Sequence, residues 1–324
     1  MSESVNPSES PVVAGSSSTS NNNTNRKPPE IDYTKLPAGK ELKSENLPAP
    51  KDWRPWDRVK LPVDILLLTV VDCEFLACAH YLKPEFYTSC HEKLGPVCFG
   101  EIGEEGQDSL KIALYQSPDK GPTEATIVVK NTVEVLKPKA AIWVGFCGGL
   151  KEDKVKSGDV VISSKLRTYS AEKVTEERTV DRNIAAPSFK NFLNLLKFAD
   201  HGWNPPLKDE AGLKVKVVKN GVLLSGPKVV DNKKLRSERT ERFPDADAIE
   251  MEGEGKSLAA ESVKKERVGQ ECEGWEGRRV SYINQSLVLE NTRADKITGV
   301  FFPFTFQLTL DHALPKLNNC SFRG

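Results

Sequence analysis

Apolar runs of strand length, separated by segments with helical periodicity, most constrain how this chain folds. Residues 63–71 form a near-continuous apolar run, which is typical of a strand buried on both faces. Residues 140–144 form a second buried run, and residues 112–115, 158–163 and 246–253 give further strand candidates. Strands that alternate with helices predict a single α/β domain with a mixed, largely parallel central sheet flanked by helices.

The helices that we expect lie between these runs. One opens at Asp72 and a second at Thr123, and both residues are expected to act as N-caps. Two more helices are expected over residues 189–199 and 232–242, from their apolar spacing and their charge respectively. Residues 215–224 predict a hairpin with an Asn-Gly turn.

Domain boundaries follow from changes in composition. Residues 1–52 contain the polar run 16–23 and several prolines, so we expect a disordered tail. The folded domain is expected over residues 53–265. Residues 266–324 lose the regular pattern, although 300–308 is a last strand candidate. This divergent segment is either an incomplete end of the same domain or the product of an altered gene model or splice form.

The composition argues against several kinds of partner. Lys plus Arg and Asp plus Glu both number 46, so net charge gives no reason to expect nucleic acid or an anionic membrane. No apolar run approaches the roughly 18–20 residues of a membrane helix, and the N-terminus lacks a signal-peptide core. The seven cysteines are scattered, which favours a cytoplasmic or nuclear location. The four histidines have no metal-ligand spacing, so no metal site is expected.

Unusual residues follow four of the predicted strands. They occupy Asp72–Glu74, Gly145–Gly149, Ser225–Gly226 and Glu250–Gly253. Ligands of open α/β sheets bind beyond the carboxyl ends of the strands, so these segments are candidate site residues. The two carboxylates of the last segment follow an apolar strand, where burial is costly unless they hold something polar.

Taken in this order, the segments resemble the superfamily of purine and uridine phosphorylases and methylthioadenosine/S-adenosylhomocysteine nucleosidases. The matching stretches are Leu67–Glu74, Val144–Leu150, Gly158–Val161 and Ile249–Gly253. The resemblance covers about residues 62–262 and looks closest to the nucleosidase-like branch that is attached to signalling modules. It implies a small-molecule nucleoside as ligand, a homo-oligomeric assembly and no cofactor.

The resemblance also implies a role for each matched residue. Glu252 would accept hydrogen bonds from the ribose 2′ and 3′ hydroxyls and stabilise a sugar that becomes cationic in the transition state. Met251 would pack its thioether on the sugar. Glu74 would position and deprotonate an attacking water. Cys147 and Gly148 would let the backbone approach the sugar and the base.

Further positions complete the family pattern or depart from it. Val229 would give the base an apolar contact, and Glu250 belongs to the same substrate-binding set. Phe146 stands where phosphorylases commonly place a Ser or Thr that touches phosphate, so water is favoured over phosphate, which is left as an alternative co-substrate. The family's Asp that protonates the leaving purine has no clear counterpart, and Tyr282 or Asn284 stands near its position.

The expected function is therefore cleavage of the N-glycosidic bond of a purine nucleoside, by hydrolysis in preference to glycosyl transfer to phosphate. Glu74 and Glu252 are the expected catalytic residues. Loss of a general acid commonly costs about 10²–10⁴ in rate. The missing Asp thus leaves an alternative open, in which the chain binds a nucleoside without cleaving it and acts as a sensor or signalling module.

Overall fold

The structure is a computed structural model of the chain. It describes residues 30–103, 109–151, 153–156, 158–177, 179–182, 185–187, 204, 206–209, 215–228, 232–255 and 281–288. The helix expected over 189–199, the strand expected over 300–308, Val229 and the first 29 residues lie outside the described ranges.

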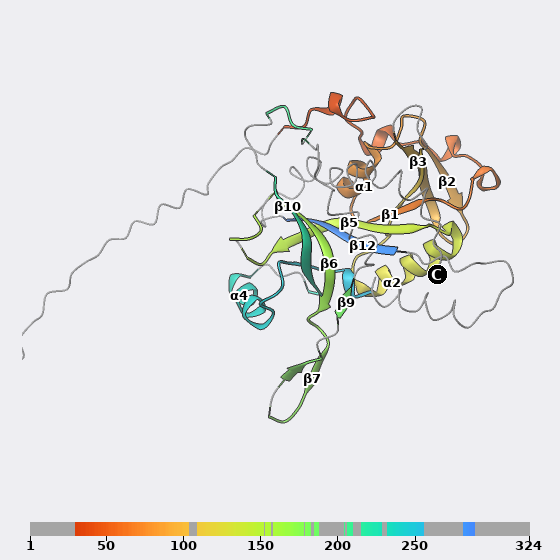
Figure 1. The fold of residues 1–324 in the computed structure, drawn as a ribbon. Coiled ribbons are helices and arrows are strands. Elements are labelled where there is room, and N and C mark those ends of the chain that lie inside the picture. Colours follow the sequence, from red (N-terminus) through yellow and green to blue (C-terminus); the bar gives the residue numbers. More distant parts are fainter. Residues whose placement is uncertain are drawn as a thin grey trace, which may run out of the picture.

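A ten-stranded mixed sheet forms the centre of the molecule (Figure 1). Its strands follow the order β11-β10-β6-β12-β5-β1-β4-β3-β2, with β9 paired to β6. β11 also pairs with β5, so the strands from β5 through β12, β6 and β10 to β11 close into a ring. The strands are β1 Ile65–Thr69, β2 Tyr87–His91, β3 Gly95–Ile102, β4 Leu110–Gln116, β5 Ala140–Gly149, β6 Val160–Thr168, β9 Ala185–Pro187, β10 Val217–Ser225, β11 Ala248–Glu250 and β12 Ser281–Val288. Strands β7 Glu172–Val174 and β8 Thr179–Asp181 form a separate antiparallel pair.

The strand β1 lies at the centre and is buried on both faces. It pairs in parallel with β4 on one side and with β5 on the other. Leu66 and Leu68 pack with the helix α2 (Pro122–Leu136) on one face of the sheet. Ile65 and Leu67 pack with α1 (Asp72–Ala79) on the opposite face. The predicted α/β fold, with a mixed and largely parallel sheet between helices, is confirmed.

The helices begin slightly differently from our expectation. Val71 is the N-cap of α1, so Asp72 is the first helical residue and not the cap. Gly121 is the N-cap of α2, whose first residue is a proline, so Thr123 is not a cap either. The helix expected over 232–242 is α4 (Lys233–Arg242), and Asn232 caps it. Within the described ranges, no helix is both long and apolar enough to cross a membrane.

The segment before β1 corrects the expected extent of the tail. Residues 30–52 take a defined path over α1 and the β2–β3 hairpin, through short 3-10 turns that include η1 (Tyr33–Lys35), η2 (Ser44–Asn46) and η3 (Pro50–Asp52). Leu36 and Leu42 are buried in the same core cluster as α1. Isolated leucines in a polar, proline-containing stretch carry no periodicity, so their burial could not be read from the sequence.

The hairpin that we expected over residues 215–224 is wrong. β10 runs through this segment as one strand, parallel to β6, with register shifts on both sides of Gly221. A Cβ added to Gly221 would lie 2.3 Å from the Val161 Cγ1 atom of β6. The glycine therefore serves a close approach between neighbouring strands, and the Asn-Gly pair does not form a turn.

Candidate functional site

The predicted site segments meet at the carboxyl ends of the strands. Phe146, near the end of β5, contacts Glu74 of α1 through a hydrogen bond. Gly148, two residues later, pairs with Ile249 of β11. Ser225, the last residue of β10, pairs with the last residue of β11. A continuous series of contacts thus links all four segments, as their positions after the strands predicted.

Glu74 holds two strands together through its carboxylate. The side chain is 3% exposed. Its Oε2 atom accepts hydrogen bonds from the Val70 and Val71 N–H groups, at 2.8 and 3.1 Å. Its Oε1 atom accepts a hydrogen bond from the Phe146 N–H group at 3.2 Å. The carboxylate therefore joins the end of β1 to the glycine-containing end of β5.

At the end of β5, Cys147 is buried and Gly148 has no side chain. Cys147 is buried in a cluster with residues of β6, β10 and β11, so its thiol belongs to the core. Gly148 is partly exposed, and a Cβ added there would lie 3.4 Å from the Ile249 side chain. This distance is an ordinary van der Waals contact, so the pairing of β5 with β11 does not itself require a glycine. The expected approach of the Gly148 backbone to a ligand stays a prediction.

The segment at the end of β11 buries one of its two carboxylate residues and leaves the other partly exposed. Glu250 is 5% exposed, and its carboxylate accepts hydrogen bonds from the Glu252 N–H group at 3.0 Å and the Gly253 N–H group at 2.9 Å. Met251 and Glu252 keep partial exposure. Glu250 therefore anchors the turn, while the two residues that follow it are accessible. Contact of these three residues with a substrate stays a prediction.

A glycine fixes where this turn packs. A Cβ added to Gly255 would lie 1.7 Å from the Pro122 carbonyl oxygen at the start of α2. The Thr126 hydroxyl of α2 donates a hydrogen bond to the Gly255 carbonyl at 3.1 Å. The turn after β11 can approach α2 this closely only because residue 255 has no side chain.

Residues 168–170, at the end of β6, contact Ser225 and Glu254 and were missed from the sequence. The Glu254 N–H group donates to the Ser225 hydroxyl at 2.8 Å, and the Glu254 carboxylate accepts a hydrogen bond from the Ser170 hydroxyl at 2.7 Å. The Ser170 hydroxyl also lies 2.9 Å from that of Thr168. The expected strand ended at Ser163, whereas β6 continues to Thr168. A correct strand end would have brought residues 168–170 into the candidate set.

The register of β12 differs from our expectation for the leaving-group residue. β12 is parallel to β5, and its register pairs Tyr282 with Ala141 and Asn284 with Trp143. These pairs lie several residues before the carboxyl end of β5. The β12 residues beside Gly145–Cys147 are instead 286–288.

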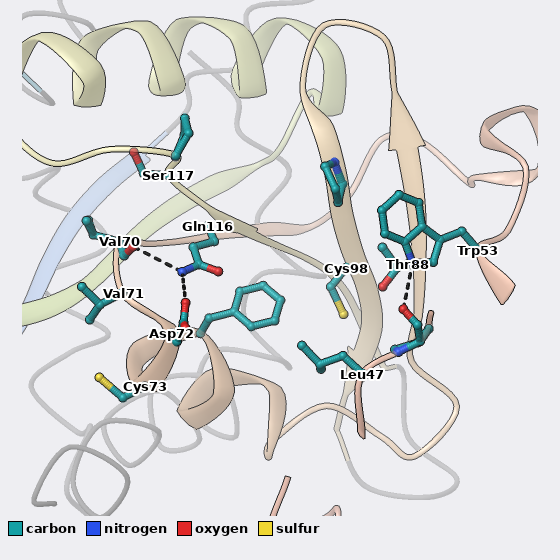
Figure 2. A pocket seen from close by; sticks show the side chains of 14 residues that line it. Leu47, Trp53, Val70, Val71, Asp72, Cys73, Thr88, Cys98, Gln116 and Ser117 are labelled. Atoms are coloured by element: carbon teal, nitrogen blue, oxygen red, sulfur yellow. Dashed lines mark hydrogen bonds between the residues drawn. The ribbon is translucent and has the colours of Figure 1, made fainter. Parts of the chain in front are cut away.

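A pocket of about 830 Å³ opens at the carboxyl ends of β1 and β4 (Figure 2). Its wall includes residues 70–73, the segment whose N–H groups hold Glu74. Gln116 points between Val70 and Asp72 and donates a 2.8 Å hydrogen bond to the Asp72 carboxylate. Leu47 and Trp53 of the N-terminal segment form part of the other wall. The predicted residues Glu74, Cys147, Gly148 and 250–252 are not among the residues that line this pocket.

Known proteins are similar to this chain in sequence and in fold. The model of the phosphorylase superfamily matches residues 73–255, which is more than half of the chain. A death domain-containing ATP nucleosidase from Amphimedon queenslandica is 27% identical over 252 residues, which is 72% of this chain and 47% of the relative. The chain thus spans about half the length of the curated relative that it matches.

Solved structures of nucleosidases have a similar fold. The 5′-methylthioadenosine/S-adenosylhomocysteine nucleosidase of Neisseria meningitidis, in complex with methylthio-immucillin-A, gives a TM-score of 0.55 at 15% identity, covering 79% of this chain and 98% of that one. The corresponding enzyme of Colwellia psychrerythraea 34H, in complex with adenine, gives 0.54 at 14%, covering 80% and 96%. Futalosine hydrolase of Helicobacter pylori strain 26695 gives 0.53 at 15%, covering 80% and 98%. With more than half of its length matched by the family model and its sheet arranged in the same way, the chain belongs to the phosphorylase superfamily.

Proposed function

We propose that this chain hydrolyses the N-glycosidic bond of a purine nucleoside or nucleotide. The observation that carries the proposal is the hydrogen bond between the Glu74 carboxylate and the end of β5. Strand β5 pairs with β11, and Glu252 lies two residues after the end of β11. The similarity to an ATP nucleosidase supports an adenine-containing substrate. The reaction requires water and no cofactor.

The proposed reaction divides the work between two carboxylates. Glu252, which is partly exposed, accepts hydrogen bonds from the ribose hydroxyls and stabilises positive charge on the sugar ring. Glu74 orients a water molecule and takes its proton. The water oxygen bonds to the anomeric carbon as the bond from that carbon to the base nitrogen breaks. The leaving base takes a proton from solvent, and Glu74 returns the water's proton to solvent. The products are the free base and the sugar, or the sugar phosphate when the substrate is a nucleotide.

Water is favoured over phosphate by the residue at position 146. Phe146 has no side-chain donor, and its N–H group donates to the Glu74 carboxylate at 3.2 Å. An anion that sought the same N–H group would have to compete with this carboxylate and would lie close to its negative charge. Phosphorolysis is therefore the less favoured reaction.

One observation favours a second function, the binding of a nucleoside without cleavage. The residues of β12 beside Gly145–Cys147 are Ser286, Leu287 and Val288, and none of them carries a carboxyl group. A site without a general acid for the leaving base would bind the ligand but turn it over slowly. The chain would then act as a nucleoside sensor.

Release of free base decides between these functions. The purified full chain is incubated with adenosine, inosine, guanosine, uridine, methylthioadenosine and ATP, with and without phosphate, and products are separated by liquid chromatography. Release without phosphate, lost in Glu252→Gln and kept in the exposed-surface control Glu134→Gln, supports hydrolysis. Release that requires phosphate refutes it. Binding of a nucleoside by calorimetry with no release under any condition supports the sensor.

A further inference from the structure

The residue Tyr169, which follows β6 directly, holds the loop that follows β10. Its hydroxyl donates a hydrogen bond to the Lys228 carbonyl at 2.9 Å and accepts one from the Lys228 N–H group at 3.1 Å. The Tyr169 N–H group donates to the Ser225 carbonyl at 3.0 Å. Three hydrogen bonds from one residue therefore fix both ends of the loop 225–228.

The tyrosine ring fits against a glycine of the same loop. A Cβ added to Gly226 would lie between 2.5 and 2.8 Å from three ring carbons of Tyr169. The ring is 2% exposed, and the guanidinium carbon of Arg239 lies 4.4 Å from its centroid. Burial raises the pKa of Tyr169 above its usual value, so the hydroxyl keeps the proton that it donates.

The tip of the loop lies at the surface. Residues 227 and 228 are exposed, whereas Gly226 and Ser225 are buried. What the hydroxyl adds is a single defined path for the backbone. A residue that served packing alone would need only the ring.

We infer that Tyr169 is a positioning residue that sets the affinity of the site for the purine base, by fixing the loop 225–228. In the chain, the loop is followed directly by Val229, the residue that the resemblance places near the base. The inference rests on the proposed function, because that function supplies the base. Preordering of the loop saves the entropy that binding would otherwise cost.

The test is the variant Tyr169→Phe, which keeps the ring, its contact with Gly226 and its contact with Arg239, and removes only the hydroxyl. The matched control is Tyr115→Phe, since Tyr115 is buried and its hydroxyl donates one hydrogen bond, to the Leu94 carbonyl at 3.1 Å. Adenine and D-ribose are the two probes, with affinities measured by calorimetry. Hydrogen exchange of peptides that cover residues 226–228 reports on the loop.

We expect Tyr169→Phe to weaken adenine binding by about tenfold, as a loop that must be ordered on association does, and to leave the affinity for ribose unchanged. Exchange at residues 226–228 becomes faster, and the thermal midpoint stays close to that of Tyr115→Phe. Where base release is measurable, KM rises by about the same factor while kcat changes less than threefold. The control variant changes neither the adenine affinity nor the exchange.

Three results would overturn the inference. Faster exchange with unchanged adenine affinity would mean that the loop does not contribute to base binding. Equal weakening of adenine and ribose would indicate a general loss of structure. A wild-type chain that does not bind adenine would remove the base from this loop altogether. Failure of the proposed function gives a different pattern, in which adenine binds and responds to Tyr169→Phe but no base is released.

Discussion

Replacing Glu74 with glutamine separates the structural role of this side chain from its proposed chemical role. The carboxylate accepts two N–H groups at the end of β1, at 2.8 and 3.1 Å, and the Phe146 N–H group at 3.2 Å. Glutamine has one acceptor oxygen, and its amide nitrogen can only donate. If the oxygen keeps the pair at β1, the amide faces the Phe146 N–H group, donor against donor.

The expected cost follows from these three bonds. A buried donor left without an acceptor costs about 1–3 kcal/mol. The two remaining bonds lose their charged acceptor, which reduces each from about 1.5–3 to about 0.5–1.5 kcal/mol. Because the three N–H groups are only partly buried, the lower halves of these ranges apply. We therefore expect Glu74→Gln to lower the free energy of unfolding by about 3–4 kcal/mol.

Two measurements on the same variant test this reasoning. Urea unfolding, followed by tryptophan fluorescence, gives the change in the free energy of unfolding. Base release, measured where the variant is fully folded, should fall by about 10²–10⁴ if Glu74 is the general base. Glu134→Gln is the control, because that glutamate lies on the surface of α2 with its side chain 58% exposed.

The two results fail independently. An unchanged free energy of unfolding would contradict the three hydrogen bonds of Glu74. Reduced stability with normal turnover would refute the general-base role and leave Glu74 as the tie between β1 and β5. Reduced turnover with normal binding of the nucleoside would support the proposed chemistry.

Three other predictions concern binding, packing and pH. Glu252→Gln should weaken adenosine binding by about tenfold or more, because a charge-assisted hydrogen bond is lost. An unchanged affinity in calorimetry would reject the contact of Glu252 with the ribose. Glu250→Gln should lower the free energy of unfolding by about 1–3 kcal/mol in urea, because one oxygen can no longer accept the N–H groups of Glu252 and Gly253. His80 is neutral in the fold, because burial lowers its pKa below 6.5 and its Nε2 atom accepts the Leu42 N–H group. Below about pH 6.5 the unfolded chain therefore binds a proton that the folded chain does not. The contribution of His80 to stability is complete above about pH 6.5 and falls as the pH drops toward the lowered pKa. The difference between the urea midpoints at about pH 7.5 and about pH 5 should be smaller in His80→Gln than in the wild type.

The centre of the fold could be predicted from the sequence because the buried strand there consists almost entirely of apolar residues. The run at 63–71 is almost continuously apolar, and its alternate side chains pack on opposite faces of the sheet. Carboxylates and glycines after such runs stand out, because neither is expected in a buried strand. The same contrast identified Glu74, Gly148 and the segment 250–253, and the structure links these segments by contacts.

The wrong predictions share one cause. The local sequence does not show which residues from other elements a residue contacts in the folded chain. Gly221 follows Asn220, and this pair predicts a turn, but the glycine is needed where β10 passes Val161 of β6. Leu42 stands among polar residues, but it packs on α1. β6 was expected to end near Ser163 because polar residues follow, and it continues because β10 pairs with it as far as Thr168. Each residue was assigned from its neighbours in sequence, while a partner from another element decided its conformation.

Glu250 ends β11 and Glu252 follows it, and their side chains have different surroundings. Glu250 and Glu252 are two residues apart, so a continued strand would direct both side chains to one face. β11 ends at Glu250, and the Glu250 carboxylate binds the N–H groups of Glu252 and Gly253. A buried carboxylate is stable only with such donors, so Glu250 meets its own requirement within the chain. The turn that it holds leaves Met251 and Glu252 partly exposed, and the proposed contact with the sugar therefore falls to these two residues.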